Sequence, residues 1–339
     1  RGQAWRRRGP RWQAGGMRAV TLSGFGGPEV LQVEDVEAPV AGHGELLIKT
    51  VAAGVNRADL LQRQGHYPPP PGTSELLGLE VSGYVAEVGE GVLGWAKGAP
   101  CVALLAGGGY AEYVAVDAGQ VVAPPEGIDL VTAAALIEVA ATVVSNMDHV
   151  RLAPGETLLV HGGAGGIGSF AIQYATSLGC MVVATAGSEE KLEICRELGA
   201  DVALDYHGDW PTQLREATEG YGVDVILDIM GAKYLDANVR SLAVGGRQVT
   251  IGLQGGTKGE LNLGLLLSKR GTIAATSLRF RPPSEKAAIC ERVAEVVWPM
   301  ITSGRIRLAG ETRFPVEDVR LAHEWLAGGE NVGKIVLTF

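Results

Sequence analysis

The sequence has little cysteine, and its few cysteines are not spaced as pairs. Its 339 residues include only four, and they are Cys101, Cys180, Cys195 and Cys290. A protein stapled by disulfides needs cysteines at paired spacings in an oxidising compartment. The scattered positions favour reduced thiols in the interior of a cytoplasmic protein.

An excess of positive charge is also missing. Lysine and arginine total 29 against 38 acidic residues, so the formal net charge is −9 and the isoelectric point is about 5.3. A nucleic-acid-binding protein typically carries a basic patch, so this balance argues against a nucleic-acid partner. We find no internal repeat, and no low-complexity segment outside residues 1–16.

No clean membrane span is evident. The most apolar long stretch, residues 130–147, contains Glu138 and ends in Ser145 and Asn146. A membrane helix needs about 20 predominantly apolar residues with few or no charges. We therefore predict a buried helix between two domains, and no membrane partner.

Residues 1–16 differ from the rest because they contain five arginines and no acidic residue. The arginine content is typical of a mitochondrial targeting peptide, but serine and an amphipathic period are lacking. We favour a disordered tail, left by an expression vector or by upstream readthrough. Met17 then opens a strand over residues 17–22.

A glycine-rich turn is the most informative feature that the sequence does contain. Residues 157–160 are predicted as a buried strand and residues 169–178 as a helix, and between them Gly163, Gly165 and Gly168 have the spacing G-x-G-x-x-G. In a dinucleotide-binding turn these glycines allow a tight turn, an approach to the pyrophosphate and close packing of helix on strand. The helix N-terminus then directs free N–H groups at the phosphates. The preceding His161 is expected to be structural.

The length allows two domains, each with its own core. We expect a disordered tail over residues 1–16 and a compact, barrel-like β domain over residues 17–137, with a stiff proline-rich loop after Tyr67. The strands expected there are residues 17–22, 46–51, 83–89 and 113–116.

Residues 138–272 alternate predicted strands and helices. Several strands are apolar on both faces, which predicts a parallel sheet covered by helices, an α/β Rossmann domain. The strands expected there are residues 157–160, 180–186, 202–204, 223–228 and 247–251. Residues 273–339 would supply the last strand of this sheet at 273–276, then helices, and a strand at 333–337 that returns to the first domain.

Two blocks carry a resemblance to a known family. Residues 56–67 read Asn-Arg-Ala-Asp-Leu-Leu-Gln-Arg-Gln-Gly-His-Tyr, and residues 77–83 read Leu-Gly-Leu-Glu-Val-Ser-Gly. The chain resembles the zinc-independent quinone oxidoreductase branch of the medium-chain dehydrogenase/reductase superfamily, closest to the tumour-suppressor-inducible quinone oxidoreductase subgroup. The resemblance runs over residues 17–339. It implies a GroES-like catalytic domain made from both ends of the chain, a Rossmann domain between them, NADPH in the cleft and a homodimer.

The chain departs from the family pattern in two places, around Glu138 and in the glycine turn. Relatives usually have proline before Glu138 and a large aromatic residue after it, where this chain has Ile137 and Ala140. Gly165 stands where the subgroup has serine. The first departure puts the floor of the substrate pocket in question and leaves the fold unaffected.

Zinc ligands are absent from the corresponding blocks. Zinc-dependent relatives have a cysteine in the segment that ends at Asn56 and a histidine before Glu80, where this chain has Leu79. The four-cysteine lobe is missing too, because Cys101 is the only cysteine between residues 80 and 122. We expect no metal site.

The end of the second Rossmann strand predicts the type of nicotinamide cofactor. NAD sites usually place an acidic residue there to bind the ribose hydroxyls, but this strand ends in Ala186, Gly187 and Ser188. Ser188 and Lys191 offer a hydroxyl and a positive charge to a 2′-phosphate, so we predict NADPH. The alternatives are an N-cap serine and a solvated lysine.

By resemblance, the catalytic candidates are Asn56, Tyr67 and Thr142. Asn56 would hold the nicotinamide or a substrate carbonyl, Tyr67 would stack on a flat ring or donate its phenol hydrogen, and Thr142 would lie near the nicotinamide. Each has a structural alternative: a turn asparagine, a tyrosine packed on prolines and a threonine inside a helix.

The cofactor-binding candidates follow the Rossmann strands or lie on the returning tail. They are Asn56, Thr142, Gly163, Gly165, Gly166, Ile167, Gly168, Gly187, Ser188, Lys191, Tyr206, Gly252, Leu253, Ser277, Leu278, Arg279 and Lys334.

The function that these features favour is NADPH-dependent reduction of quinones by direct hydride transfer without a metal, with a quinone or enone as substrate. An alkenal or enoyl-thioester reductase on the same scaffold is one alternative, with Tyr67 as a proton donor. A protein that binds NADPH with little turnover is another.

Overall fold

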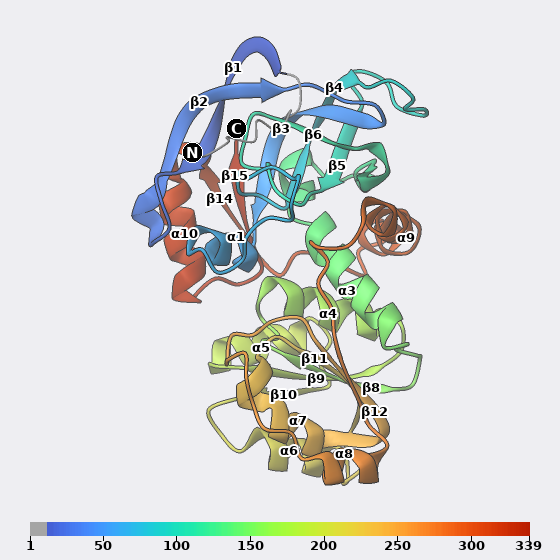
Figure 1. The fold of residues 1–339 in the computed structure, drawn as a ribbon. Coiled ribbons are helices and arrows are strands. Elements are labelled where there is room, and N and C mark those ends of the chain that lie inside the picture. The colour runs from blue at the N-terminus through green and yellow to red at the C-terminus, as the bar shows by residue number, and fades with distance from the viewer. Residues whose placement is uncertain (1–11) are drawn as a thin grey trace, which may run out of the picture.

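The computed structural model describes residues 12–339, which form two lobes (Figure 1). The upper lobe in that view combines the N-terminal third of the chain with the C-terminal strands. The lower lobe comes from the middle of the chain. The predicted α/β class, with a β-rich lobe and a lobe built on a parallel sheet, is confirmed.

A seven-stranded sheet forms the first lobe, in the order β14-β15-β3-β4-β5-β7 with β6 paired to β3. Its strands are β3 (Glu45–Val55), β4 (Glu80–Val88), β5 (Pro100–Leu104), β6 (Tyr113–Asp117), β7 (Val121–Val122), β14 (Glu311–Pro315) and β15 (Lys334–Thr338). A hairpin of β1 (Trp12–Leu22) and β2 (Leu31–Pro39) packs beside it. Strand β15 pairs with β3, which confirms the predicted return of the tail.

The second lobe is built on a six-stranded parallel sheet, in the order β10-β9-β8-β11-β12-β13. Its strands are β8 (Thr157–His161), β9 (Met181–Ala186), β10 (Val202–Asp205), β11 (Val223–Asp228), β12 (Leu242–Thr250) and β13 (Thr272–Ala275). Its helices are α4 (Gly166–Ser177), α5 (Glu189–Glu197), α6 (Trp210–Ala217), α7 (Leu235–Ser241) and α8 (Leu263–Lys269). The strand order reverses between β8 and β11, and ligands of such sheets bind at the carboxyl ends beside that switch.

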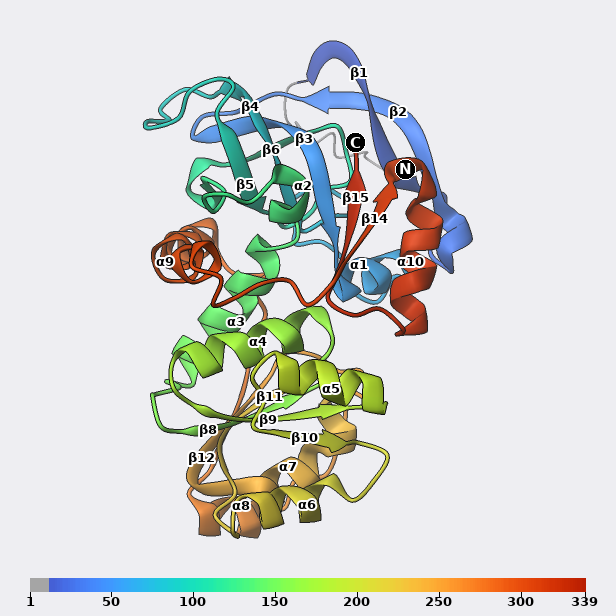
Figure 2. The same cartoon turned by 180° about the vertical axis from the view of Figure 1, so that it is seen from behind.

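Helices between and around the lobes complete the fold (Figure 2). They are α1 (Arg57–Arg63), α2 (Leu130–Ala133), α3 (Ile137–His149), α9 (Pro283–Thr302) and α10 (Val319–Gly328). Helix α3 runs from the first lobe towards the second, and α9 packs against it.

The predicted single helix over residues 130–147 is two helices. The chain turns after α2, and Glu80 Oε2 accepts the N–H of Glu138 in the first turn of α3 at 2.9 Å. A carboxylate there satisfies a free N–H and suits the positive end of the helix dipole. The segment Leu130–His149 has the length and hydropathy of a membrane span, but most of it is buried inside the protein, as in a core helix.

Several strand boundaries differ from the prediction, and the differences are largest at the starts of β1 and β12. Strand β1 begins at Trp12, so residues 12–16 are strand, because they pair with β2. The expected tail over residues 1–11 lies outside the described residues. Strand β12 begins at Leu242, ahead of the predicted residue 247, since Leu242 already pairs with Val223 of β11.

Candidate active site

The glycine turn after β8 is packed so closely that two of its glycines have no room for a side chain. A Cβ at Gly168 would lie 2.2 Å from the Gly162 carbonyl oxygen, and one at Gly163 would lie 2.7 Å from Cys195 Sγ. These two glycines therefore serve close packing of α4 and α5 on the sheet. Gly165 precedes α4, and no side chain caps the N-terminus of that helix. Its first N–H groups, around Gly166 and the half-buried Ile167, remain available to an anion.

The C-terminal segment crosses directly over this turn. Gly333 donates its N–H to the Ala164 carbonyl at 3.2 Å and forms a β-bridge with Gly165. A Cβ at Gly166 would lie 2.9 Å from the Lys334 side chain. The C-terminal tail thus lies against this turn, here called the glycine cradle (residues 162–168), and places Lys334 beside it.

At the end of β9, the structure gives the predicted phosphate-binding residues other partners. Ser188 caps α5 by accepting the Lys191 N–H at 3.3 Å, and Lys191 Nζ donates to the Gly329 carbonyl at 2.5 Å. The Tyr206 ring lies over Gly187, where a Cβ would come within 2.2 Å of its hydroxyl. The N-cap alternative for Ser188 is therefore present, whereas Lys191 is half-buried and bonded to a carbonyl instead of being solvated. The strand end carries no carboxylate.

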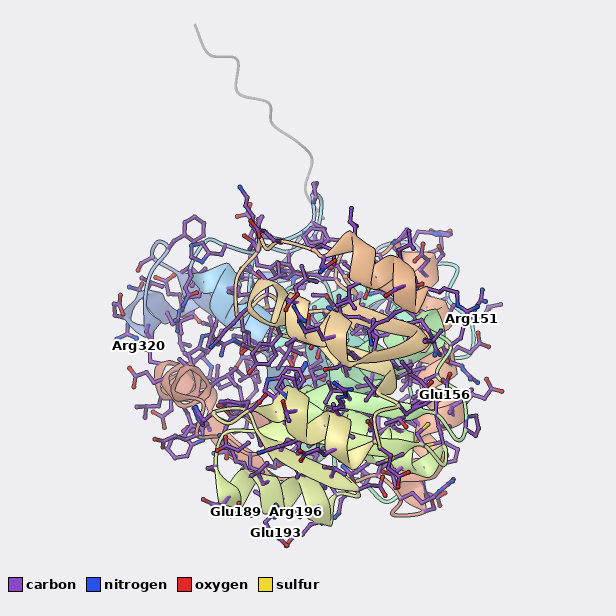
Figure 3. All side chains as sticks on the ribbon, turned by 90° about the horizontal axis from the view of Figure 1, so that it is seen from below. Arg151, Glu156, Glu189, Glu193, Arg196 and Arg320 are labelled. Carbon is purple, nitrogen blue, oxygen red and sulfur yellow. The ribbon has the colours of Figure 1, made fainter. Side chains whose placement is uncertain are left out.

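The acidic residues that follow Ser188 face outward. Glu189 and Glu193 both form ion pairs with Arg196 at 2.8 Å on the exposed surface of α5 (Figure 3). They come after the strand end and are engaged with that arginine, so they do not replace the missing ribose ligand.

The segment that follows β13 is tied to the proline-rich loop of the first lobe. Ser277 Oγ lies 3.1 Å from Tyr67 Oη. The buried Arg279 donates to the carbonyls of Ala106 (2.8 Å) and Tyr67 (3.2 Å) and to Gln62 Oε1 (2.6 Å), and its guanidinium lies 5.2 Å from the Tyr67 ring centre. Arg279 therefore positions the Tyr67 loop, and its predicted contact with the cofactor remains a prediction.

The remaining cofactor-binding candidates at the carboxyl ends of the Rossmann strands are half-buried or exposed. Gly252 and the exposed Leu253 follow β12, and Leu278 is half-buried between Ser277 and Arg279. A Cβ at Gly252 would lie 2.7 Å from the Ile229 carbonyl, so the backbone after β12 runs close to that after β11.

A buried charged cluster lies where the two lobes meet. Lys334 Nζ lies 2.5 Å from Asn56 Oδ1 and 2.7 Å from Glu80 Oε1, and Asn56 Nδ2 donates to the same Glu80 oxygen at 2.9 Å. Gly54 on β3 makes room for it, because a Cβ there would lie 2.0 Å from Glu80 Oε1. The amide of Asn56 is thus oriented by the ion pair between Glu80 and Lys334, two residues that are far apart in the sequence.

Glu138 and Thr142 extend this cluster along α3. Thr142 Oγ1 donates to Glu138 Oε1 at 3.2 Å. The pKa of Glu138 is raised to about 7, chiefly by burial; Lys334 opposes this shift, and the neighbouring carboxylate of Glu80 adds to it. Asn56, Thr142 and Lys334, predicted separately, are therefore brought together.

A second buried cluster, formed by Asp59, Tyr110 and His323, holds the N-terminus of α1 in place. Asp59 Oδ2 accepts the N–H of Asn56 at 2.8 Å and the hydroxyl of Tyr110 at 3.2 Å, and Tyr110 also lies 3.3 Å from His323 Nε2. Burial raises the pKa of Asp59 to about 6 and lowers that of His323 to about 3. This cluster fixes the start of α1, on which Asn56 is the N-cap.

His161 is structural, as predicted. It is buried between Thr185 Oγ1 (3.1 Å) and Asn238 Oδ1 (2.8 Å), and its ring packs against Trp210 and Tyr234. Burial lowers its pKa to about 4, so the ring is neutral at physiological pH.

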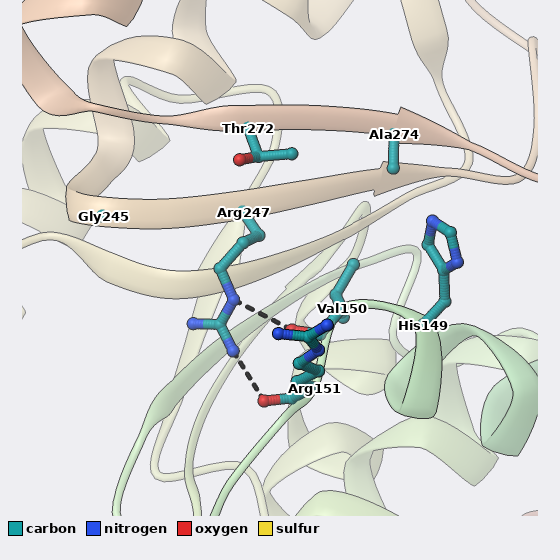
Figure 4. A pocket seen from close by; sticks show the side chains of 7 residues that line it. All are labelled: His149, Val150, Arg151, Gly245, Arg247, Thr272 and Ala274. Atoms are coloured by element: carbon teal, nitrogen blue, oxygen red, sulfur yellow. Dashed lines mark hydrogen bonds between the residues drawn. The ribbon is translucent and has the colours of Figure 1, made fainter.

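A cavity of about 420 Å³ lies elsewhere, at the opposite end of the Rossmann sheet (Figure 4). Arg247 crosses it and donates to the carbonyls of Val150 and Arg151, and it also pairs with Glu156 at 2.8 Å. Thr272, which opens β13, lines it. Because ligands of open parallel sheets bind at the carboxyl ends of the strands, this cavity is not the candidate site.

Comparisons with known proteins agree with the two-lobed architecture. Residues 42–126 match the alcohol dehydrogenase GroES-like domain, and residues 166–295 match the zinc-binding dehydrogenase family. Quinone oxidoreductase of Rattus norvegicus is 32% identical over 95% of this chain and 97% of its own length. The chain belongs to the quinone oxidoreductase branch of the medium-chain dehydrogenase/reductase superfamily.

Two further similarities are informative about this oxidoreductase. A solved mycobacterial structure in complex with NADPH is 33% identical, has a TM-score of 0.86 and covers 95% of this chain and 100% of its own. A mycocerosic acid synthase-like polyketide synthase of Mycobacterium tuberculosis is 30% identical over 87% of this chain, which corresponds to 14% of that protein. The closer relation to the tumour-suppressor-inducible subgroup stays a prediction.

The matched family is named for zinc, but the donor set of this chain does not fit that metal. An amide, Asn56, stands at the site, and the Lys334 ammonium occupies the space beside Glu80 where a cation would have to lie. Zinc sites use thiolate, imidazole and carboxylate ligands. Within residues 12–339 we find no group of three or more such side chains placed to hold a metal.

Sequence patterns do not assign Glu80 and Glu138 to the site. In the sequence, Glu138 stands out as a charge in an apolar stretch and as a landmark of the family pattern, and Glu80 as part of the block 77–83, but neither receives a role in the site. A charged residue inside an otherwise apolar run is the signal that points to Glu138. Nothing local indicates that Glu80 pairs with Lys334, because the two are 254 residues apart.

Proposed function

We propose that this oxidoreductase is an NADPH-dependent quinone reductase that acts without a metal. The observation that carries the proposal is the glycine cradle at the β8–β11 switch, which adjoins a strand end without a carboxylate. The NADPH complex of a similar mycobacterial protein supports the cofactor, and the rat quinone oxidoreductase supports the acceptor class.

NADPH fits the residues present. Gly166 and Ile167 would offer N–H groups to the pyrophosphate, while Gly165, whose N–H donates to the Gly162 carbonyl, shapes the turn before them. Ser188 with Lys191 would hold the 2′-phosphate. When bound, the cofactor supplies a hydride. The further candidates are Gly163, Gly168, Gly187, Tyr206, Gly252, Leu253, Ser277, Leu278, Arg279 and Lys334, which would shape the cleft around it.

The protein would contribute mainly positioning and exclusion of water. The amide of Asn56 is fixed by Glu80 and Lys334, and Thr142 is held by Glu138 in the same cluster. Tyr67 is held by Ser277 and Arg279 at the mouth, with one ring face against the guanidinium. Such preorganisation matters because reacting atoms must approach to about 3–3.5 Å.

The test is an acceptor screen with purified protein, following the loss of NADPH absorbance. We expect turnover with quinones, weaker turnover with simple enones, and NADPH preferred over NADH. Tight NADPH binding without turnover on any quinone or enone would favour instead the alternative of a binding protein.

Reduction of an alkenal or enoyl thioester is the second candidate. The similarity to a segment of a polyketide synthase favours it, since that protein is named for the synthesis of an acid and not for a quinone. In that case Tyr67 would donate a proton, and an enoyl thioester would be a better substrate than any quinone in the same screen.

We also propose a homodimer formed through the edge of the Rossmann sheet. Strand β13 is the edge strand, and the adjacent helix α8 exposes Leu263 and Leu267 at 68% and 78%. Unpaired strand edges and exposed apolar patches both mark association surfaces. The four cysteines are buried as free thiols, which suits the cytoplasmic location we propose.

A further inference from the structure

One face of helix α3 carries a polar stripe through an otherwise apolar core. Glu138, Thr142 and Asn146 follow one another at intervals of four residues and so share a face. Their neighbours on the helix, including Ile137 and Ala140, are fully buried, whereas Glu138 is partly open. Ile137 and Ala140, which depart from the family pattern, thus lie in the core, and Glu138 is the partly exposed residue of this turn.

The stripe is continuous with the mouth of the cleft. Asn146 Nδ2 donates to the Thr142 carbonyl at 2.7 Å, and its Oδ1 accepts from the Thr276 hydroxyl. The next residue, Ser277, meets Tyr67. The Glu138 carboxylate also raises the pKa of Tyr67, so the two side chains share one electrostatic environment across the cleft.

The carboxyl of Glu138 accepts fewer hydrogen bonds than the carboxyl of Glu80. Glu80 is fully buried and accepts hydrogen bonds from Asn56, Lys334 and the N–H of Glu138. The only partner found for the Glu138 carboxyl within the described residues is Thr142. Lys334 is therefore committed to Glu80, and Glu138 keeps one oxygen free.

The groups that interact with Glu138 electrostatically or by a hydrogen bond come from several elements. They are Glu80 on β4, Lys334 on β15, Asp59 on α1, Thr142 on α3 and Tyr67 on the loop. Two of the charged neighbours are carboxyls and one is a cation already paired. This surrounding favours the neutral, protonated form of Glu138.

We propose that Glu138 is the proton donor for the reduced substrate, a role that rests on the proposed reductase function. Hydride supplied by the cofactor leaves the quinone or enone as an oxyanion. The O–H bond of Glu138 breaks as the substrate oxygen takes that proton. The Glu138 carboxylate then regains a proton from water, so each turnover consumes one hydride and one proton.

The acidity of the group suits the task. A general acid works best when its pKa is near the operating pH, and the pKa of Glu138 is raised to about 7 by burial. Burial also raises the pKa of Tyr67 above 10, which makes the phenol a poorer donor. Glu138 is therefore the better acid of the two that border the cleft.

The first experiment measures the proton itself and needs neither cofactor nor turnover. Protein labelled with ¹³C at the glutamate carboxyls is titrated by NMR, with Glu138→Gln to assign the signal. We expect one carboxyl to titrate near pH 7, absent from Glu138→Gln and present in the control Glu126→Gln, which alters an exposed loop glutamate. A Glu138 signal that titrates near the ordinary value of about 4.3 overturns the proposal.

The second experiment compares pH profiles of kcat. Wild type should lose activity as the pH rises above about 7, because Glu138 is then deprotonated. Glu138→Gln should lose that dependence and fall by about 10²-fold or more with an enone, the range of general acid catalysis. Glu138→Asp, which keeps an acid, should retain a titrating limb. An unchanged profile in Glu138→Gln that still binds NADPH refutes the role.

The two failures are distinguishable. If no acceptor is reduced by wild type, the proposed function fails while the NMR titration still reports the protonation of Glu138. If turnover is present but the carboxyl titrates normally, only the role of Glu138 fails.

Discussion

Replacing Lys191 by alanine tests the assignment of the cofactor most directly. Strand β9 ends without a carboxylate, and Lys191 is the cation at the start of the following helix. In this structure its ammonium donates to the Gly329 carbonyl at 2.5 Å. To meet a 2′-phosphate, the side chain must exchange that acceptor for the phosphate.

The magnitude follows from this exchange. A hydrogen bond to a charged group contributes roughly 1.5–3 kcal/mol, and the contact with a neutral carbonyl that is given up contributes about 1 kcal/mol. The net gain of about 0.5–2 kcal/mol corresponds to roughly twofold to thirtyfold in affinity. The effect is specific for NADPH, because NADH has a hydroxyl at that position and should bind almost equally to both proteins.

Calorimetric titration of NADPH and NADH into wild type, Lys191→Ala and the control Lys97→Ala measures the effect. Lys97 is an exposed lysine of the first lobe, so its loss should change neither affinity. Gly187→Asp should shift the preference towards NADH, with weaker binding overall, since its Cβ displaces the Tyr206 ring. Equal losses of both nucleotides in Lys191→Ala would refute the phosphate site.

Four further outcomes are expected. Tyr67→Phe should lower kcat with a quinone by less than about tenfold, or about 1.4 kcal/mol, whereas Tyr67→Ala should cost more; a complete loss in Tyr67→Phe with an enone would favour the alkenal or enoyl reductase. The pKa of His161 falls from 6.5 to about 4 on folding, so the free energy of unfolding should decrease by about 3 kcal/mol as the pH falls from 6.5 to about 4. In urea titrations, the free energy of unfolding of His161→Gln should decrease less over this pH range. An equal decrease in wild type and variant would contradict the assignment. Leu267→Asp should convert a dimer to a monomer by light scattering, whereas a wild-type monomer at micromolar concentration would refute the dimer. Elemental analysis should find no stoichiometric zinc, and zinc lost together with activity on chelation would overturn that expectation.

The sequence alone determined the parts of this protein that depend on neighbours along the chain. The alternation of strands and helices after Glu138, the glycine turn between β8 and α4, and the absence of an acid after Ala186 are all local patterns. Hydrophobic periodicity and glycine spacing reflect the backbone geometry of each segment, so they can be interpreted without the fold. The missing zinc ligands at Asn56 and Leu79 belong to the same class, because they are a matter of residue type.

Only the tertiary structure decided how the candidate residues share hydrogen bonds. Lys334 reaches Asn56 across 278 residues because β15 pairs with β3, and that pairing also commits the ammonium to Glu80. Arg279 binds the Tyr67 loop for a similar reason. A side chain near a cleft has several possible partners, and burial selects among them, since each buried polar group must find one. Sequence patterns rank residue types at a position, but they do not say which distant acceptor the fold will bring within about 3 Å.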